Sequence, residues 1–291
     1  MSRIYASTAC TARHFTSLSA QLAAYNRHGL RQIELGHCPK LDGMRLPADL
    51  KTTAACYLVH NYFPPPTEPL VLNLASQQPP ILQASRAFYE ASLRLSAELG
   101  ASFYSLHCGF LADFAPAAFG QRLSYEQIYD YEAGYRTFVD SLKQLLTLAS
   151  RLGLRLLIEP NVVAPCNLVA GQNRLLLLAE PREFMRLLHE LNTPTLGVLL
   201  DLGHLKVNAA TLHFPIGEFM AAVSARIGAF HLHDNDGTAD QHQPIAADSW
   251  ALAILRSPAF QASPVVVEAS FPSVERLASH CQWLESVLTS H

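Results

Sequence analysis

The sequence contains few charged residues and very little lysine. Only 15% of its 291 residues are charged, below the usual value of about 25%. Four lysines stand beside 17 arginines, and the formal net charge is −3. A surface with a weak and slightly negative field does not attract a polyanion, so we expect no nucleic-acid partner.

The sequence shows no pattern that is typical of a signal peptide or a membrane helix. Its first fifteen residues contain no apolar run of about 7–15 residues such as a signal peptide has. No run of about 18 apolar residues indicates a membrane helix. The six cysteines are scattered and form no Cys-x-x-Cys pair. We therefore expect a reduced, cytoplasmic protein with no membrane partner.

Apolar residues are plentiful and make up 49% of the chain. Short apolar runs bounded by glycine, proline or polar residues are typical of buried parallel strands. The sequence predicts eight strands, at residues 4–6, 32–36, 54–59, 102–107, 155–159, 196–201, 227–231 and 264–268.

Segments with helical spacing separate these runs. They cover residues 18–27, 47–51, 83–99, 125–152, 183–191, 216–227, 249–255 and 274–288, and Gly100 and Gly153 follow two of them as C-caps. Eight alternating units in a chain of this length predict an α/β fold, the (β/α)8 TIM barrel. Because no low-complexity linker or shift in composition divides the chain, we predict a single domain over residues 1–291.

Residues that can bind metal recur at the ends of the predicted strands, where barrel active sites are built. Mixed imidazole and carboxylate ligands suit zinc, manganese, iron or cobalt. Glu159 and Glu268 each close an apolar run, where a carboxylate is costly to bury unless it is paired or metal-bound. The nine candidate ligands are His60, His107, Glu159, Asp201, His204, His231, Asp240, His242 and Glu268.

Taken alone, a histidine such as His60 or His107 at a strand end is more often structural than a ligand. The joint placement of nine residues at the same face of a barrel favours a metal site. A barrel that binds metal without catalysis is a further alternative, but the completeness of the set argues against it.

These motifs resemble the xylose isomerase-like TIM barrel superfamily, and their ligand pattern is closest to endonuclease IV (AP endonuclease family 2). The matching order is two early histidines, Glu in LLIEP, Asp-x-x-His in DLGH, His in FHLHDND, Asp-x-His in DQH, and Glu in VVVEAS. The resemblance spans about residues 55–270. It implies up to three metal ions, zinc first, held by the nine residues, with Glu159 and Glu268 as catalytic residues.

The sequence also departs from the endonuclease pattern. The opening Gly-x-His-x-Ser motif is absent, and Gln241 stands where a basic residue is usual. The basic loops that would grip DNA phosphates are not evident. We therefore expect a small-molecule substrate.

Two reactions fit this ligand set. The preferred interpretation is hydrolysis of a small phosphate ester or related oxygen-rich substrate, in which two metals turn a bridging water into hydroxide near neutral pH. The alternative is a sugar or sugar-phosphate isomerase or epimerase, which would use one metal and move a proton with Glu159 and Glu268. The arginine of those relatives is missing, because Gly237 stands in its place.

Four further residues are candidate substrate contacts. His233 lies on the same side as His231 by strand alternation, and it could contact substrate or position a ligand. Asp234 could orient a ligand or cap the following loop. Glu34 and His37, in QIELGH, resemble residues of sugar-isomerase relatives. We expect the loops at residues 111–119 and 162–174 to determine the substrate.

Overall fold

The computed structural model describes residues 3–66, 68–116 and 122–289. Parallel strands follow one another around a closed barrel, and the last strand pairs with the first. The predicted (β/α)8 TIM barrel is therefore confirmed. The strands are β1 (Ile4–Ser7), β2 (Gln32–Leu35), β3 (Cys56–His60), β4 (Phe103–His107), β5 (Arg155–Glu159), β6 (Leu196–Asp201), β7 (Ile227–Leu232) and β8 (Val265–Val267).

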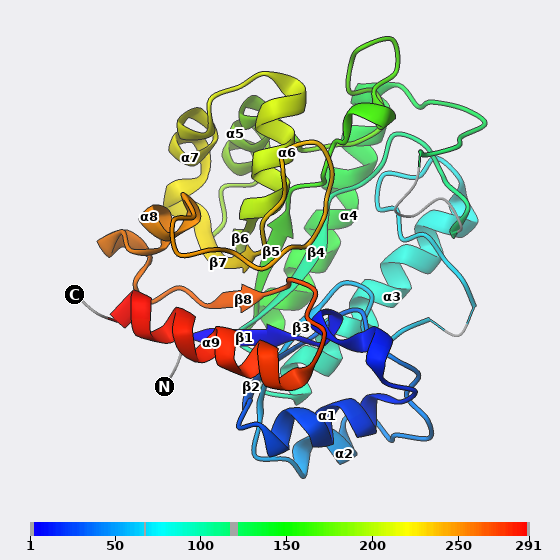
Figure 1. The fold of residues 1–291 in the computed structure, drawn as a ribbon. Coiled ribbons are helices and arrows are strands. Elements are labelled where there is room, and N and C mark those ends of the chain that lie inside the picture. Colours follow the sequence, from blue (N-terminus) through cyan, green and yellow to red (C-terminus); the bar gives the residue numbers. More distant parts are fainter. Residues whose placement is uncertain (1–2, 67, 117–121, 290–291) are drawn as a thin grey trace.

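Helices surround the strands, and the last of them packs beside β1, the first strand (Figure 1). None of the helices in the described ranges is long and apolar enough to cross a membrane. The helices are α1 (Leu18–Arg27), α2 (Ala48–Lys51), α3 (Pro79–Glu98), α4 (Tyr131–Arg151), α5 (Pro181–Leu191), α6 (Leu202–Leu212), α7 (Ile216–Val223), α8 (Ala251–Leu255) and α9 (Val274–Thr289).

The helix α6 was not predicted from the sequence. It begins directly after β6 with no intervening loop. Asp201 ends the strand and also caps the helix, because its Oδ1 accepts the backbone N–H of His204 at 2.7 Å. A capping carboxylate satisfies one of the free N–H groups at a helix start. This hydrogen bond fixes the side chain of Asp201 even when no metal or substrate is bound.

The predicted start of the long helix at residue 125 was wrong. The helix α4 begins six residues later, after Asp130, whose side chain accepts the N–H of Ala133 at 2.9 Å. The apolar residues before this cap belong instead to the loop that follows β4. Loop residues therefore remain available at the mouth of the barrel.

The inside of the barrel contains a dry layer of side chains, which we call the inner apolar layer. One residue from each of β3 to β8 contributes to it: Leu58, Phe103, Leu157, Leu199, Ala229 and Val266. Alternate residues of a strand point to the same face. The residues two positions further along, toward the carboxyl ends, therefore also point inward and lie above this layer.

Candidate metal centre

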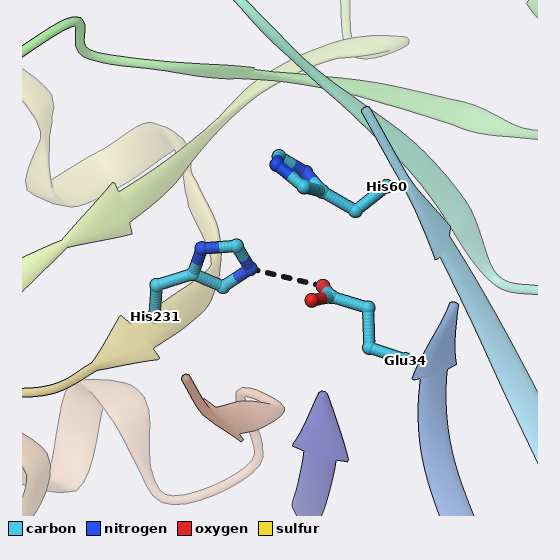
Figure 2. Close-up of side chains that lie close together, drawn as sticks. All are labelled: Glu34, His60 and His231. Atoms are coloured by element: carbon cyan, nitrogen blue, oxygen red, sulfur yellow. Dashed lines mark hydrogen bonds and ion pairs between the residues drawn. The ribbon is translucent and has the colours of Figure 1, made fainter. Parts of the chain in front are cut away.

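His231 lies at the centre of an arrangement that requires a cation or a proton. Its Nε2 lies 2.9 Å from Oε2 of Glu34 on β2, and Figure 2 shows the two side chains pointing toward each other. A carboxylate only accepts, so Nε2 carries the hydrogen and the neutral ring presents a lone pair at Nδ1. That Nδ1 lies 3.0 Å from Glu268 Oε2, 3.4 Å from Glu159 Oε1 and 3.8 Å from Asp201 Oδ2. A lone pair facing three carboxylates is repelled unless a positive charge lies among them.

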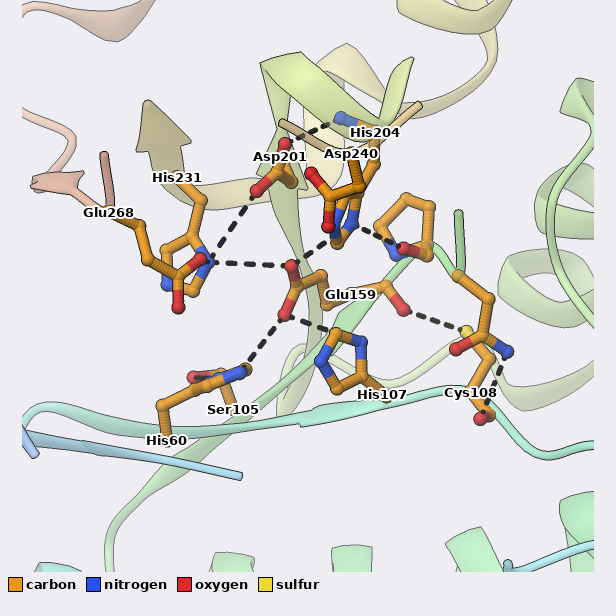
Figure 3. A network of polar contacts seen from close by, with 12 residues as sticks. His60, Ser105, His107, Cys108, Glu159, Asp201, His204, His231, Asp240 and Glu268 are labelled. Atoms are coloured by element: carbon orange, nitrogen blue, oxygen red, sulfur yellow. Dashed lines mark hydrogen bonds and ion pairs between the residues drawn. The ribbon is translucent and has the colours of Figure 1, made fainter. Parts of the chain in front are cut away.

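Glu159, at the end of β5, is enclosed by histidines (Figure 3). Its Oε2 lies 3.2 Å from His60 Nε2 and 3.6 Å from His107 Nδ1. Its Oε1 lies 3.3 Å from His204 Nδ1 and 3.4 Å from His231 Nδ1. Neither oxygen is hydrogen-bonded within the described residues, although both are buried. Such a carboxylate is costly unless metal ions or protons compensate for its charge.

Asp240 faces two histidines, His242 and the His204 that also lies beside Glu159. His204 donates from Nδ1 to the carbonyl of Pro160 at 3.1 Å, and His242 donates from Nδ1 to the carbonyl of Glu268 at 2.9 Å. These bonds leave the lone pairs of both neutral rings at Nε2. The two Nε2 atoms lie 3.3 and 3.0 Å from the same oxygen, Asp240 Oδ2. This arrangement too calls for a cation or for protonated rings.

Without a metal, protons would compensate for the carboxylate charges. Burial lowers the pKa of His204 and of His231, but the surrounding carboxylates outweigh burial and hold both pKa values well above the ordinary value. Burial also opposes the charge of His242, yet its bond to Asp240 raises its pKa to about 9. Burial lowers the pKa of His107 to about 4. A metal bound to His204, His231 and His242 would take the place of the protons on these rings.

The donor atoms group into sets whose members all lie within 4.8 Å of one another. We call Glu159, Asp201, His231 and Glu268 the four-donor set. The other groups in the described residues are His60, His107 and Glu159; Asp201, His204 and His233; His233, Asp240 and His242; and Glu34, His60 and His231. Imidazole and carboxylate donors at this spacing fit divalent metals, and they exceed the number that one ion needs.

His233 contacts two acidic residues and does not line the cavity described below. Its Nε2 lies 3.1 Å from Asp201 Oδ2 and 3.5 Å from Asp240 Oδ1. Its ring packs so closely on Gly203 that a Cβ there would lie 2.0 Å from the ring. The glycine of DLGH therefore makes room for this histidine, which joins the two groups of ligands.

The other three candidate substrate contacts also lie away from the cavity. Asp234 accepts a bond from Lys206 Nζ on α6 at 2.7 Å. Glu34 is fully buried against His231, and His37 is exposed in the loop after β2. The role of Glu34 escaped sequence analysis because 197 residues separate it from His231.

A cavity of about 530 Å³ opens at the carboxyl ends of the strands. Five of the nine candidate ligands line it: His107, His204, Asp240, His242 and Glu268. The side chain of Glu268 is 12% exposed, whereas that of Glu159 is 1% exposed. Of the two glutamates, Glu268 alone can therefore touch a substrate. The loop at residues 162–174 contributes to the cavity wall as expected, but part of the loop at 111–119 lies outside the described residues.

Residues 20–287 match the family model described as "Xylose isomerase-like TIM barrel". The chain belongs to this family. No curated protein sequence matches the chain. The family is thus established over nearly the whole length, and the site geometry must indicate the reaction.

Several solved structures share the fold across both chains. A D-tagatose 3-epimerase-like protein has 15% identity and a TM-score of 0.71, covering 99% of this chain and 98% of its own. An L-ribulose 3-epimerase has 13% identity and a TM-score of 0.70, covering 100% and 95%. A Thermus thermophilus protein soaked with ZnCl2 has 19% identity and a TM-score of 0.62, covering 100% and 99%. At such low identity the likeness concerns the fold alone.

Proposed function

We propose that this chain is a divalent-metal-dependent isomerase or epimerase of a small, carbohydrate-like substrate. The four-donor set supports the proposal, because it supplies two glutamates, an aspartate and a histidine around one point. The epimerases among the structures of the same fold also support it. They favour this alternative over hydrolysis, which the sequence pattern alone placed first.

The observation that carries the proposal is the position of Glu268. Its Oε2 faces the four-donor set, 3.0 Å from His231 Nδ1, and its side chain also reaches the cavity. Glu159, Asp201, His231 and Glu268 would hold the metal. When bound, the metal polarises a substrate carbonyl and so acidifies the adjacent C–H bond.

Glu268 would then take the proton from that carbon, because it is the carboxylate of the set that a substrate can reach. Glu159, expected from the sequence as the second catalytic glutamate, is enclosed by four histidines. We assign it to metal binding. A histidine of the cavity wall, His107 or His242, would return the proton.

Deuterium exchange tests this proposal. The protein loaded with zinc, manganese or cobalt is incubated in D₂O with ketoses, aldoses and their phosphates, and deuterium at the substrate carbons is measured by NMR. Uptake that requires metal is the expected result. Phosphodiester hydrolysis without deuterium uptake would contradict it.

Hydrolysis remains a second candidate because of one observation. Glu159 lies among histidines, and a further donor group surrounds Asp240, so these residues would offer donors for more than one metal. Two metals about 3.5–4 Å apart can bind a hydroxide and a phosphoryl oxygen. Elemental analysis separates the two candidate functions. One metal per chain favours isomerisation, and two or three, with cleavage of bis(p-nitrophenyl) phosphate, favour hydrolysis.

A further inference from the structure

Two unlike groups of residues line the cavity at the barrel mouth. Candidate ligands form one group. The apolar residues of the other group, which we call the apolar wall, are Phe110, Leu123, Val162, Ala164 and Leu176. Leu176 is buried, and the other four are half-buried. The apolar wall therefore exposes hydrocarbon surface to the cavity.

Three residues of the apolar wall are held by a hydrophobic cluster separate from the main core: Leu176 is part of it, and Phe110 and Leu123 pack against it. Its two loops are tied together, since Leu111 N–H donates to Leu175 O at 2.7 Å and Leu177 N–H donates to Gly109 O at 3.1 Å. The ring of Phe110 packs edge-on against Phe114, with centroids 5.3 Å apart. This surface is held in place in advance of any ligand.

An unsubstituted sugar would use only part of this space. Cavities of about 300–1,000 Å³ accommodate drug-sized ligands, and the cavity of about 530 Å³ lies within this range. Apolar surface left facing water is unfavourable, and covering it strengthens binding. The apolar wall thus matches a hydrocarbon group on the substrate.

We propose that the substrate is amphipathic, with an oxygen-rich head at the candidate ligands and an apolar acyl, alkyl or aryl substituent along the apolar wall. The inference rests on the proposed function for the metal at the head end. It adds a chemical class that excludes free sugars and simple sugar phosphates as the preferred substrates. Apart from the candidate ligands, polar residues also line the cavity: the exposed Arg122 is charged, and Asn161 and Asn167 are neutral.

Hydroxamates provide a test that needs no knowledge of the reaction. Their head chelates a divalent metal through two oxygens, and the tail can be varied. The metal-loaded protein is titrated with acetohydroxamate, octanohydroxamate and suberic acid monohydroxamate, whose tail ends in a carboxylate. We expect octanohydroxamate to bind at least tenfold more tightly than the other two.

Two variants locate the effect. Phe110→Ala should reduce the advantage of octanohydroxamate over acetohydroxamate at least fivefold. Val162→Asn, a second change in the same wall, should act in the same direction if Phe110→Ala does not fold. Met185→Ala is the control, because Met185 is an exposed apolar residue that does not line the cavity.

The other outcomes overturn the inference in distinguishable ways. Equal affinities for acetohydroxamate and octanohydroxamate, or an advantage that both wall variants retain, would exclude a role for the apolar wall. Tighter binding of the suberic compound would assign the substituent to an anion at Arg122. Failure of every hydroxamate to bind would defeat the proposed metal function as well, because the head depends on the metal.

Discussion

The inner apolar layer and the candidate metal centre belong to the same strands and lie only two residues apart. On β5, β6 and β7 the inner layer contributes Leu157, Leu199 and Ala229, all fully buried. Two positions later the same strands contribute Glu159, Asp201 and His231, which are equally buried. The first row packs mainly against other apolar side chains, and the second is closed by charges that face one another.

This difference shows that burial alone does not predict chemistry. A buried leucine is stable wherever hydrocarbon surrounds it, whereas a buried carboxylate is stable only where histidines, protons or metal ions surround it. The barrel supplies such surroundings at one end only, where eight loops meet. Adding or removing a charge in the inner apolar layer or in the candidate metal centre should therefore have different effects.

The largest effect should follow from placing a charge in the inner apolar layer. Leu199→Asp would put a carboxylate into this layer of apolar side chains, and its cost should exceed the about 2–5 kcal/mol of a leucine-to-alanine change. We expect loss of the cooperative unfolding transition, measured by circular dichroism in urea. Leu199→Met, which conserves volume, should remain folded. A stable Leu199→Asp protein would show that water or a counter-ion enters the layer.

Removing the charge that reaches the cavity should affect the reaction and spare the fold. Glu268→Gln should lower kcat by about 10²- to 10⁴-fold, the usual contribution of a positioned acid or base. The melting temperature of the metal-free variant should stay close to that of the parent. Steady-state kinetics on the substrate identified in D₂O would measure the effect, and a loss smaller than tenfold would exclude Glu268 as the proton carrier.

Metal removal should weaken the metal centre and leave the inner layer intact. A ligand that binds the folded state at 100 times its Kd stabilises that state by about 2.7 kcal/mol. We expect chelation to lower the melting temperature and zinc or manganese to restore it. Scanning calorimetry with elemental analysis of the same samples provides the check. Identical curves after verified metal loss would count against an intact site.

A smaller effect should follow from replacing Glu34, which does not line the cavity. Glu34→Ala frees His231 to present either nitrogen, and such supporting changes typically weaken metal affinity about 10- to 100-fold. Glu34→Gln should cost less, because its amide oxygen can still accept the Nε2–H. Competition with a fluorescent chelator measures both. Glu183→Gln is the matched control, since Glu183 is a buried carboxylate bonded to Tyr131 on the outer helices. An equal loss of metal affinity in the Glu183→Gln variant would refute the role of Glu34.

The bounds of the strands were predictable from the sequence to within about two residues. The helix α6, which the sequence analysis missed, shows why other elements were not predictable. Runs such as RLLIE and GVLLD are short, apolar and bounded by breakers, so their assignment needs no partner. The segment LGHLKVNAATL follows the strand with no punctuation, and several of its residues are buried. Its start depends on the side chain of Asp201 turning back to cap it, which the sequence does not reveal.

By itself the sequence determined the alternation of strands and helices and the residue types at the strand ends, because both follow from local spacing. The tertiary structure decided which atoms face one another. Glu34 and His231 come from β2 and β7, and only the closed barrel brings them to 2.9 Å. Likewise Glu159 and Glu268 look alike in sequence, yet one is enclosed by histidines and the other reaches the cavity. The physical reason is that ring orientation and burial depend on neighbours distant in the chain.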